Sequence, residues 1–100
     1  MEKNYNNIPL NQIEKQKKYF YGSLIDLLFK QEAGYPLMDA RIQTLINQIK
    51  GSNAIFDYQP EVLSIVASLE TAREDPAQFR KCVLDAANLV DRLKGGDANV

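Results

Sequence analysis

Residues 11–33 read NQIEKQKKYFYGSLIDLLFKQEA, and this stretch decides the fold of the chain. It is the longest helical pattern in the sequence and contains four of the nine aromatic residues. Gly34 can adopt the left-handed backbone conformation that ends a helix, and Pro36, two residues later, prevents the helix from continuing. One narrow apolar stripe recurs at helical spacing and predicts a core-facing side: Ile13, Phe20, Leu24 and Leu27, with Leu28 beside it.

The same helix carries a second row of apolar residues. Tyr21, Ile25 and Phe29 follow one another at i, i+4 and i+8, displaced toward the opposite side from the core stripe. A helix at the edge of a simple bundle does not need this second row. The surplus apolar surface is the feature of the sequence that most directly invites a functional interpretation.

Three shorter helices follow, and each has a proline at its predicted start. Pro36 and Pro60 suit the first turn of a helix, and Asp75 with Pro76 and Gln78 forms a capping-box pattern. The apolar positions between these signals recur with helical spacing. The predicted helices are near 10–33, 36–50, 60–74 and 76–94.

These elements predict an all-α protein, a four-helix and largely antiparallel bundle. We expect one domain over 9–95, a flexible N-terminal arm at 1–8 and a disordered tail at 96–100. The first helix is about 35 Å long and the third about 22 Å, at 1.5 Å per residue. Either the first helix overhangs the bundle or a second chain covers the excess.

The longest connection, at residues 51–59, is unusually apolar for a loop. We predict that Phe56 and Tyr58 close the end of the bundle, and that Tyr58 packs onto Leu63 as a hydrophobic staple. A short strand at AIFDY is the alternative, although no second strand is available to pair with it.

The composition argues against catalysis and against a metal or cofactor site. The chain has 100 residues, a net charge of −1, no histidine and a single cysteine, Cys82, which we expect to be a small buried side chain. The glycines do not form a phosphate-binding loop, and the carboxylates lie off the predicted core stripes. We therefore expect no enzyme activity, no catalytic residue, no cofactor and no metal site.

No run of residues is long and apolar enough to predict a membrane span or a secretory signal. A cytoplasmic location is the resulting expectation.

The second row has two interpretations. In the first, the long helix is central and the other helices pack around more than one side of it. In the second, Tyr21, Ile25 and Phe29, with Lys18 beside them, are exposed and contact a protein partner or a second copy. Such a homodimer would be two-fold and isologous.

Our functional hypothesis is that the chain is a non-enzymatic protein-binding module: a small regulator, adaptor or neutralising protein. We expect it to self-associate through the first helix. Small immunity proteins of bacteriocin producers are comparable in size and helical content, but no motif here ties the chain to them. The alternative is a nucleic-acid-associated regulator that uses Lys15, Lys17 and Lys18. Because Tyr19, Phe20 and Tyr21 point in three directions on a helix, they form no continuous stacking platform, and nucleic acid is the less favoured partner.

Overall fold

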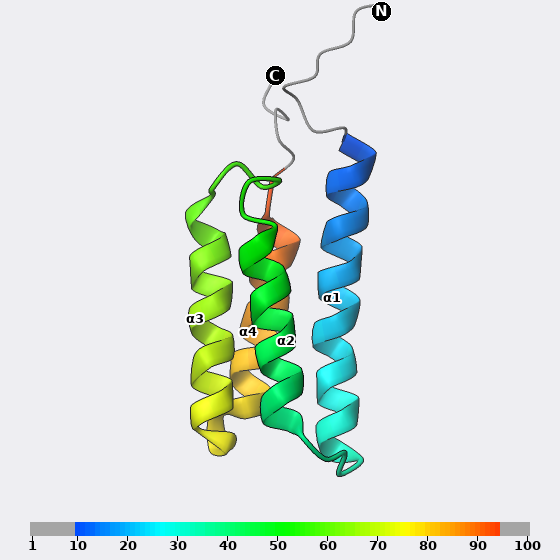
Figure 1. Ribbon diagram of the computed structural model, residues 1–100, viewed down its shortest axis with the longest axis vertical. Coiled ribbons are helices and arrows are strands. Elements are labelled where there is room, and N and C mark those ends of the chain that lie inside the picture. The colour runs from blue at the N-terminus through cyan, green and yellow to red at the C-terminus, as the bar shows by residue number, and fades with distance from the viewer. Residues whose placement is uncertain (1–9, 95–100) are drawn as a thin grey trace, which may run out of the picture.

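The computed structural model describes residues 10–94, with side chains from Gln12 onward, and the described chain is built from helices. They are α1 (Leu10–Glu32), α2 (Met38–Gly51), α3 (Pro60–Glu74), the short 3₁₀ turn η1 (Pro76–Gln78) and α4 (Phe79–Arg92). Consecutive α-helices run in opposite directions (Figure 1). The predicted all-α, antiparallel four-helix bundle is confirmed. The predicted arm at 1–8 and tail at 96–100 lie outside the described residues.

The helices occupy the corners of a square in chain order. α1 packs against α2 and α4, α3 packs against the same two helices, and α1 and α3 lie on a diagonal without packing on each other. α1 is therefore a corner helix. Helices do pack on more than one side of it, since α2 and α4 both contact it, but the hypothesis that α1 is central is wrong.

Each helix contributes one stripe to a single core, as the spacing predicts. Burial of these apolar side chains is the main source of stability in such a bundle. The largest fully buried side chains are Phe20, Phe56, Ile13, Leu24, Ile46, Ile49, Ile65, Leu69, Val62, Val83 and Val90. Cys82 belongs to the same core.

The connection between α2 and α3 closes one end of the bundle with one aromatic side chain rather than two. Phe56 is fully buried and its ring lies 6.4 Å from that of Phe20, centroid to centroid. Tyr58 is 68% exposed, so the predicted plug at Tyr58 is wrong, and Leu63, its predicted staple partner, is 64% exposed. The backbone explains the difference, because Asp57 and Tyr58 both adopt positive φ and turn the chain outward after Phe56.

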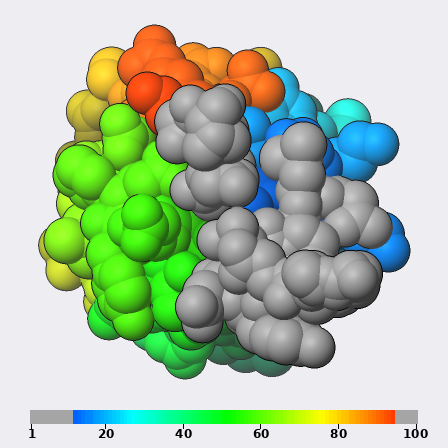
Figure 2. Space-filling view, turned by 90° about the horizontal axis from the view of Figure 1, so that it is seen from above, coloured from blue at the N-terminus to red at the C-terminus, as the bar shows by residue number. Residues whose placement is uncertain are grey.

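The same end of the molecule is ringed by three segments that are distant in sequence. Viewed from above, the loop (green), the carboxyl end of α4 (orange to red) and the start of α1 (blue) surround it (Figure 2). Residues 52–58 form successive turns, and no strand occurs between residues 10 and 94.

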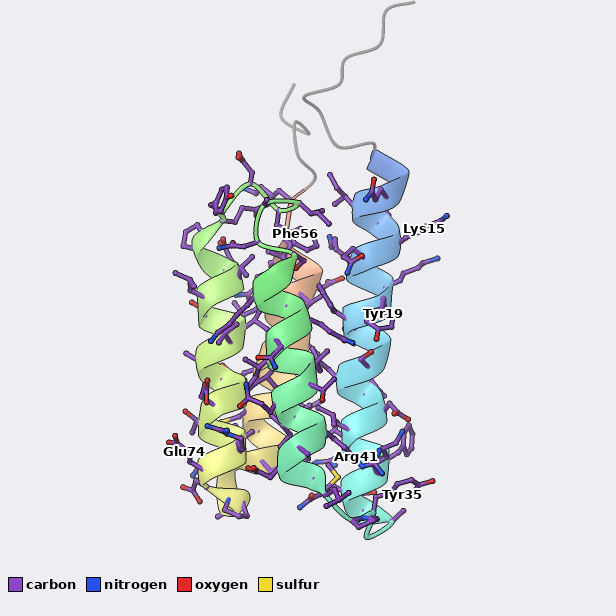
Figure 3. All side chains as sticks on the ribbon, in the orientation of Figure 1. Lys15, Tyr19, Tyr35, Arg41, Phe56 and Glu74 are labelled. Atoms are coloured by element: carbon purple, nitrogen blue, oxygen red, sulfur yellow. The ribbon has the colours of Figure 1, made fainter. Side chains whose placement is uncertain are left out.

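α2 begins at Met38, two residues later than predicted. Leu37 has φ 59° and ψ 36°, a left-handed conformation that cannot continue a right-handed helix. The Nε of Arg41 donates a hydrogen bond to the Pro36 carbonyl at 3.0 Å, and the guanidinium lies 5.3 Å from the Tyr35 ring centroid (Figure 3). These contacts hold Pro36 outside the helix.

The fourth helical segment starts and ends differently from its prediction. Asp75 caps it as expected, accepting a hydrogen bond from the Ala77 amide at 3.1 Å, but the first turn is 3₁₀. The α-helix ends at Arg92 instead of Lys94, because Leu93 is extended (φ −63°, ψ 136°) and the Gln59 side chain exchanges two hydrogen bonds with the Lys94 backbone.

Gly34 ends α1 as predicted. It has φ 77°, its amide bonds the Gln31 carbonyl at 3.1 Å, and the Tyr35 amide bonds the Lys30 carbonyl at 2.9 Å. This is the Schellman arrangement, in which a residue without Cβ adopts the left-handed conformation at little cost.

Gly34→Ala and Gly22→Ala should change stability in opposite directions. Neither new methyl group meets an atom within 4 Å, so only backbone preference differs between the two sites. At Gly34 the positive φ should cost about 1 kcal/mol, whereas inside α1 the loss of Gly22 should stabilise by about 1 kcal/mol. Urea denaturation of the two variants beside the parent measures both changes, and equal changes would contradict the assignment of Gly34 to a left-handed cap.

Val83→Asp should unfold the protein. Val83 is fully buried in α4, where an unpaired carboxylate costs several kcal/mol. Circular dichroism should show loss of the cooperative thermal transition. A Val83→Asp variant that melts at the parent's temperature would contradict the burial of this face of α4.

Candidate protein-binding site

The second row of α1 lies at the protein surface. Phe29 is 67% exposed, Tyr21 is 43% exposed and Ile25 is half-buried. Lys18, one turn before Tyr21, is exposed. The interpretation of these residues as a second core row is wrong, and the structure brings the four predicted site residues together on one face.

The corner position of α1 explains this exposure. One side of α1 meets α2, the adjacent side meets α4, and the core stripe lies between them. The remaining directions have no helix of the described chain against them (Figure 1). Ile25 is nearer the α4 side and is partly covered, whereas Phe29 points farther out.

α4 continues the exposed face beyond α1. Arg80 donates to the Glu32 carboxylate at 3.1 Å, so these two residues lie side by side at one end of the antiparallel pair. Leu84 lies one turn along α4 from Arg80 and is 38% exposed, and Leu28 lies one turn before Glu32. Leu84 and Leu28 are therefore at the same height on neighbouring helices. The sequence did not single out Leu84, because its role depends on which helix lies beside α4.

A shallow groove continues this face toward the start of α1. It has a volume of about 400 Å³ and combines charged side chains with the Tyr21 ring and the backbone at Gly22. Its lining residues are Glu14, Lys17, Lys18, Tyr21, Gly22, Val90 and Asp91.

The three lysines of the alternative hypothesis do not act as one group. Lys17 donates from Nζ to the Leu93 carbonyl at 2.7 Å and to the Asp91 carbonyl at 3.3 Å, at the carboxyl end of α4. Its charge is thereby engaged by the negative end of a helix. Lys15 points away from the bundle (Figure 3) and Lys18 lies beside the second row.

A second groove separates α1 from α2 and differs in character. It has a volume of about 360 Å³, and the Tyr19 hydroxyl crosses between the helices to the Gln48 Oε1 at 3.1 Å. Lys30 is paired with Asp26 and also lies 5.5 Å from the Tyr35 ring centroid. These polar groups of the groove already have partners within the chain. The sequence did not predict this groove, because it depends on how α1 and α2 pack against each other.

Titratable groups of the described chain do not gather into a reactive cluster. Between residues 10 and 94, no three side chains of the histidine, cysteine, aspartate or glutamate types are placed to hold one metal ion. The pKa of Lys81 is raised because its ammonium donates to the Asp85 carboxylate at 3.0 Å, an exposed pair on the surface of α4. Among the described helices, none combines the length and the apolar character that crossing a membrane requires.

Comparison with protein-family models, with curated proteins and with solved structures found no match to this chain. The surface of α1 and the residues around it are therefore the basis for inferring a function.

Lys17→Met should destabilise the protein, because it removes a charged cap from α4 while keeping most of the aliphatic side chain. We expect a loss of about 1 kcal/mol in the free energy of unfolding, measured by urea denaturation. Lys15→Met is the matched control and should change stability by less than about 0.5 kcal/mol, since Lys15 is exposed. Equal effects of the two substitutions would show that the Lys17 contact with Leu93 contributes nothing.

Proposed function

We propose that this chain is a non-enzymatic protein-binding module, a small regulator, adaptor or neutralising protein, that self-associates through α1. The observation that carries the proposal is the exposure of Phe29, on the same face as Tyr21 and Ile25. Leu28 and Leu84 extend the apolar surface toward α4.

A partner that covers these side chains gains free energy from burying them. Complete burial of a phenylalanine is worth roughly 1.5–3 kcal/mol relative to exposure. Single exposed apolar residues are ordinary, but a contiguous row rimmed by charged side chains is typical of an interaction surface. Lys18 and Glu32 provide that rim at the two ends of the row.

The surface also fits a second copy better than an unrelated small ligand. The second row is convex and follows one helix, whereas small molecules bind in concave sites that surround them. An apolar helical face is buried most simply by another helix. A two-fold contact brings the same face from both copies, so each apolar side chain is covered without requiring a different partner sequence.

The nucleic-acid alternative is the weaker proposal. Of the three lysines, Lys17 is engaged by the Leu93 and Asp91 carbonyls, which leaves Lys15 and Lys18 to contact phosphates. Two lysines give a small, strongly salt-dependent contribution to binding. Retention on immobilised DNA or RNA that disappears after Lys15→Glu and Lys18→Glu would favour this alternative over self-association.

Phe29→Glu should convert a dimer into a folded monomer. The side chain is largely exposed in the single chain, so a glutamate there should leave the fold intact while placing charge in the interface. Sedimentation velocity over a range of protein concentrations measures the association, and circular dichroism checks the fold.

Leu63→Glu is the matched control for this substitution. Leu63 is 64% exposed but lies on α3, diagonally across the bundle from α1, so its replacement should leave the dimer unchanged. A parent protein that stays monomeric at high concentration would refute self-association. A Phe29→Glu variant that unfolds would instead place this residue in the core.

A further inference from the structure

Lys18 and Glu32 flank the second row symmetrically. Lys18 lies seven residues before Ile25 and Glu32 lies seven residues after it. Residues seven apart lie on nearly the same face of a helix. Both charged side chains are exposed. Over about 21 Å of α1, at 1.5 Å per residue, the exposed face therefore passes from positive through apolar to negative.

We propose that a second copy of this chain packs against this face with its α1 antiparallel and with Ile25 at the two-fold axis. This inference rests on the proposed self-association and specifies its geometry. Each residue then meets the one equally far from Ile25 on the other side: Tyr21 meets Phe29 of the second copy, and Lys18 meets Glu32 of the second copy. Symmetry produces both contacts twice.

The charges select the antiparallel arrangement. In a parallel pair in register, Lys18 would meet Lys18 of the second copy and Glu32 would meet Glu32, giving like charges at both ends. In the antiparallel pair both ends carry opposite charges. Like charges across an interface are unfavourable, and charge pairs of this kind determine orientation more than they determine affinity.

α4 reinforces each end of the proposed contact. Arg80 holds the Glu32 carboxylate from the side at 3.1 Å, with both side chains about two-thirds exposed. Lys18 of the second copy would approach the same carboxylate from the open direction. Toward the centre, the half-buried Leu28 and the exposed Leu84 widen the apolar contact at the height where Tyr21 of the second copy would lie.

The size of this face predicts a reversible dimer. Stable interfaces bury about 800 Å² on each partner, whereas here one row on α1 with Leu28 and Leu84 beside it supplies the apolar part of the contact. We therefore expect association to depend on protein concentration over an accessible range, which allows changes in affinity to be measured in either direction.

Reversal of the two charges tests the geometry. The variants are Lys18→Glu, Glu32→Lys and the double substitution, with Glu74→Lys as a control that reverses an exposed charge on α3, away from the row (Figure 3). Each single variant places like charges at both ends of its homodimer, so its dissociation constant should rise about tenfold or more. The double variant restores opposite charges and should return to within about threefold of the parent.

An equal mixture of the two single variants tests whether the weakening seen in each variant alone is reversed. In a mixed dimer, Glu at position 18 of one chain meets Lys at position 32 of the other, and the second contact is the native Lys18 with Glu32. The mixture should therefore associate more tightly than either variant alone. Any repulsion between Arg80 and Lys at position 32 within one chain is the same before and after mixing, so it does not affect the comparison.

Sedimentation velocity on the parent, the variants and the mixture separates the possible outcomes. If the parent dimerises and Phe29→Glu dissociates it, but the charge reversals have no effect or the mixture fails to associate, the antiparallel geometry is refuted and the proposed function stands. If the parent is monomeric, or if Phe29→Glu leaves the dimer intact, both proposals fail. Association restored by mixing and by the double variant supports the geometry.

Discussion

A square of four helices covers two sides of each helix, and α1 carries apolar side chains on a third. Its core stripe, which includes Phe20 and Leu24, is fully used by packing against α2 and α4. The second row is only partly covered by these contacts, since Ile25 is half-buried whereas Tyr21 and Phe29 are exposed. This mismatch between the apolar surface of α1 and the number of its neighbours is the constraint from which the functional argument follows.

Polar contacts connect the helices at their ends and seams. They join side chains or carbonyls that are far apart in sequence, and so they stabilise the relative positions of whole helices rather than single turns. These contacts include Lys17 with the Leu93 carbonyl, Gln59 with the Lys94 backbone, Tyr19 with Gln48, Arg73 with Gln43 and Arg80 with Glu32. The last reaches the charged end of the second row, and none of them crosses the three apolar side chains in its middle.

Two connections show how local backbone geometry overrides a helix signal. Proline suits the first turn of a helix, and at Pro60 this prediction is correct. At Pro36 it is wrong because the next residue, Leu37, is left-handed and Arg41 binds the Pro36 carbonyl. Tyr58 is directed outward by positive φ at Asp57 and at its own backbone. A bulky residue with positive φ is uncommon, so no pattern of residue types predicts it.

The candidate surface was partly predictable from the sequence. The i, i+4, i+8 spacing places Tyr21, Ile25 and Phe29 on one face whatever surrounds the helix. Whether that face is core or surface could not be read from spacing, because a central helix would bury it. Leu84 could not be included at all, since its place beside α1 depends on the register fixed by Arg80 with Glu32 and by Lys17 with Leu93.

The amino-acid sequence alone determined the number of helices, most of their ends, and the side of each helix that faces the core. It did so because helix periodicity and capping are local, acting over a few residues. Only the tertiary structure decided which helices are neighbours, and therefore that α1 stands at a corner with Phe29 exposed. That decision depends on long-range packing, in which every helix must bury its stripe at once, and no single segment of the chain contains that information.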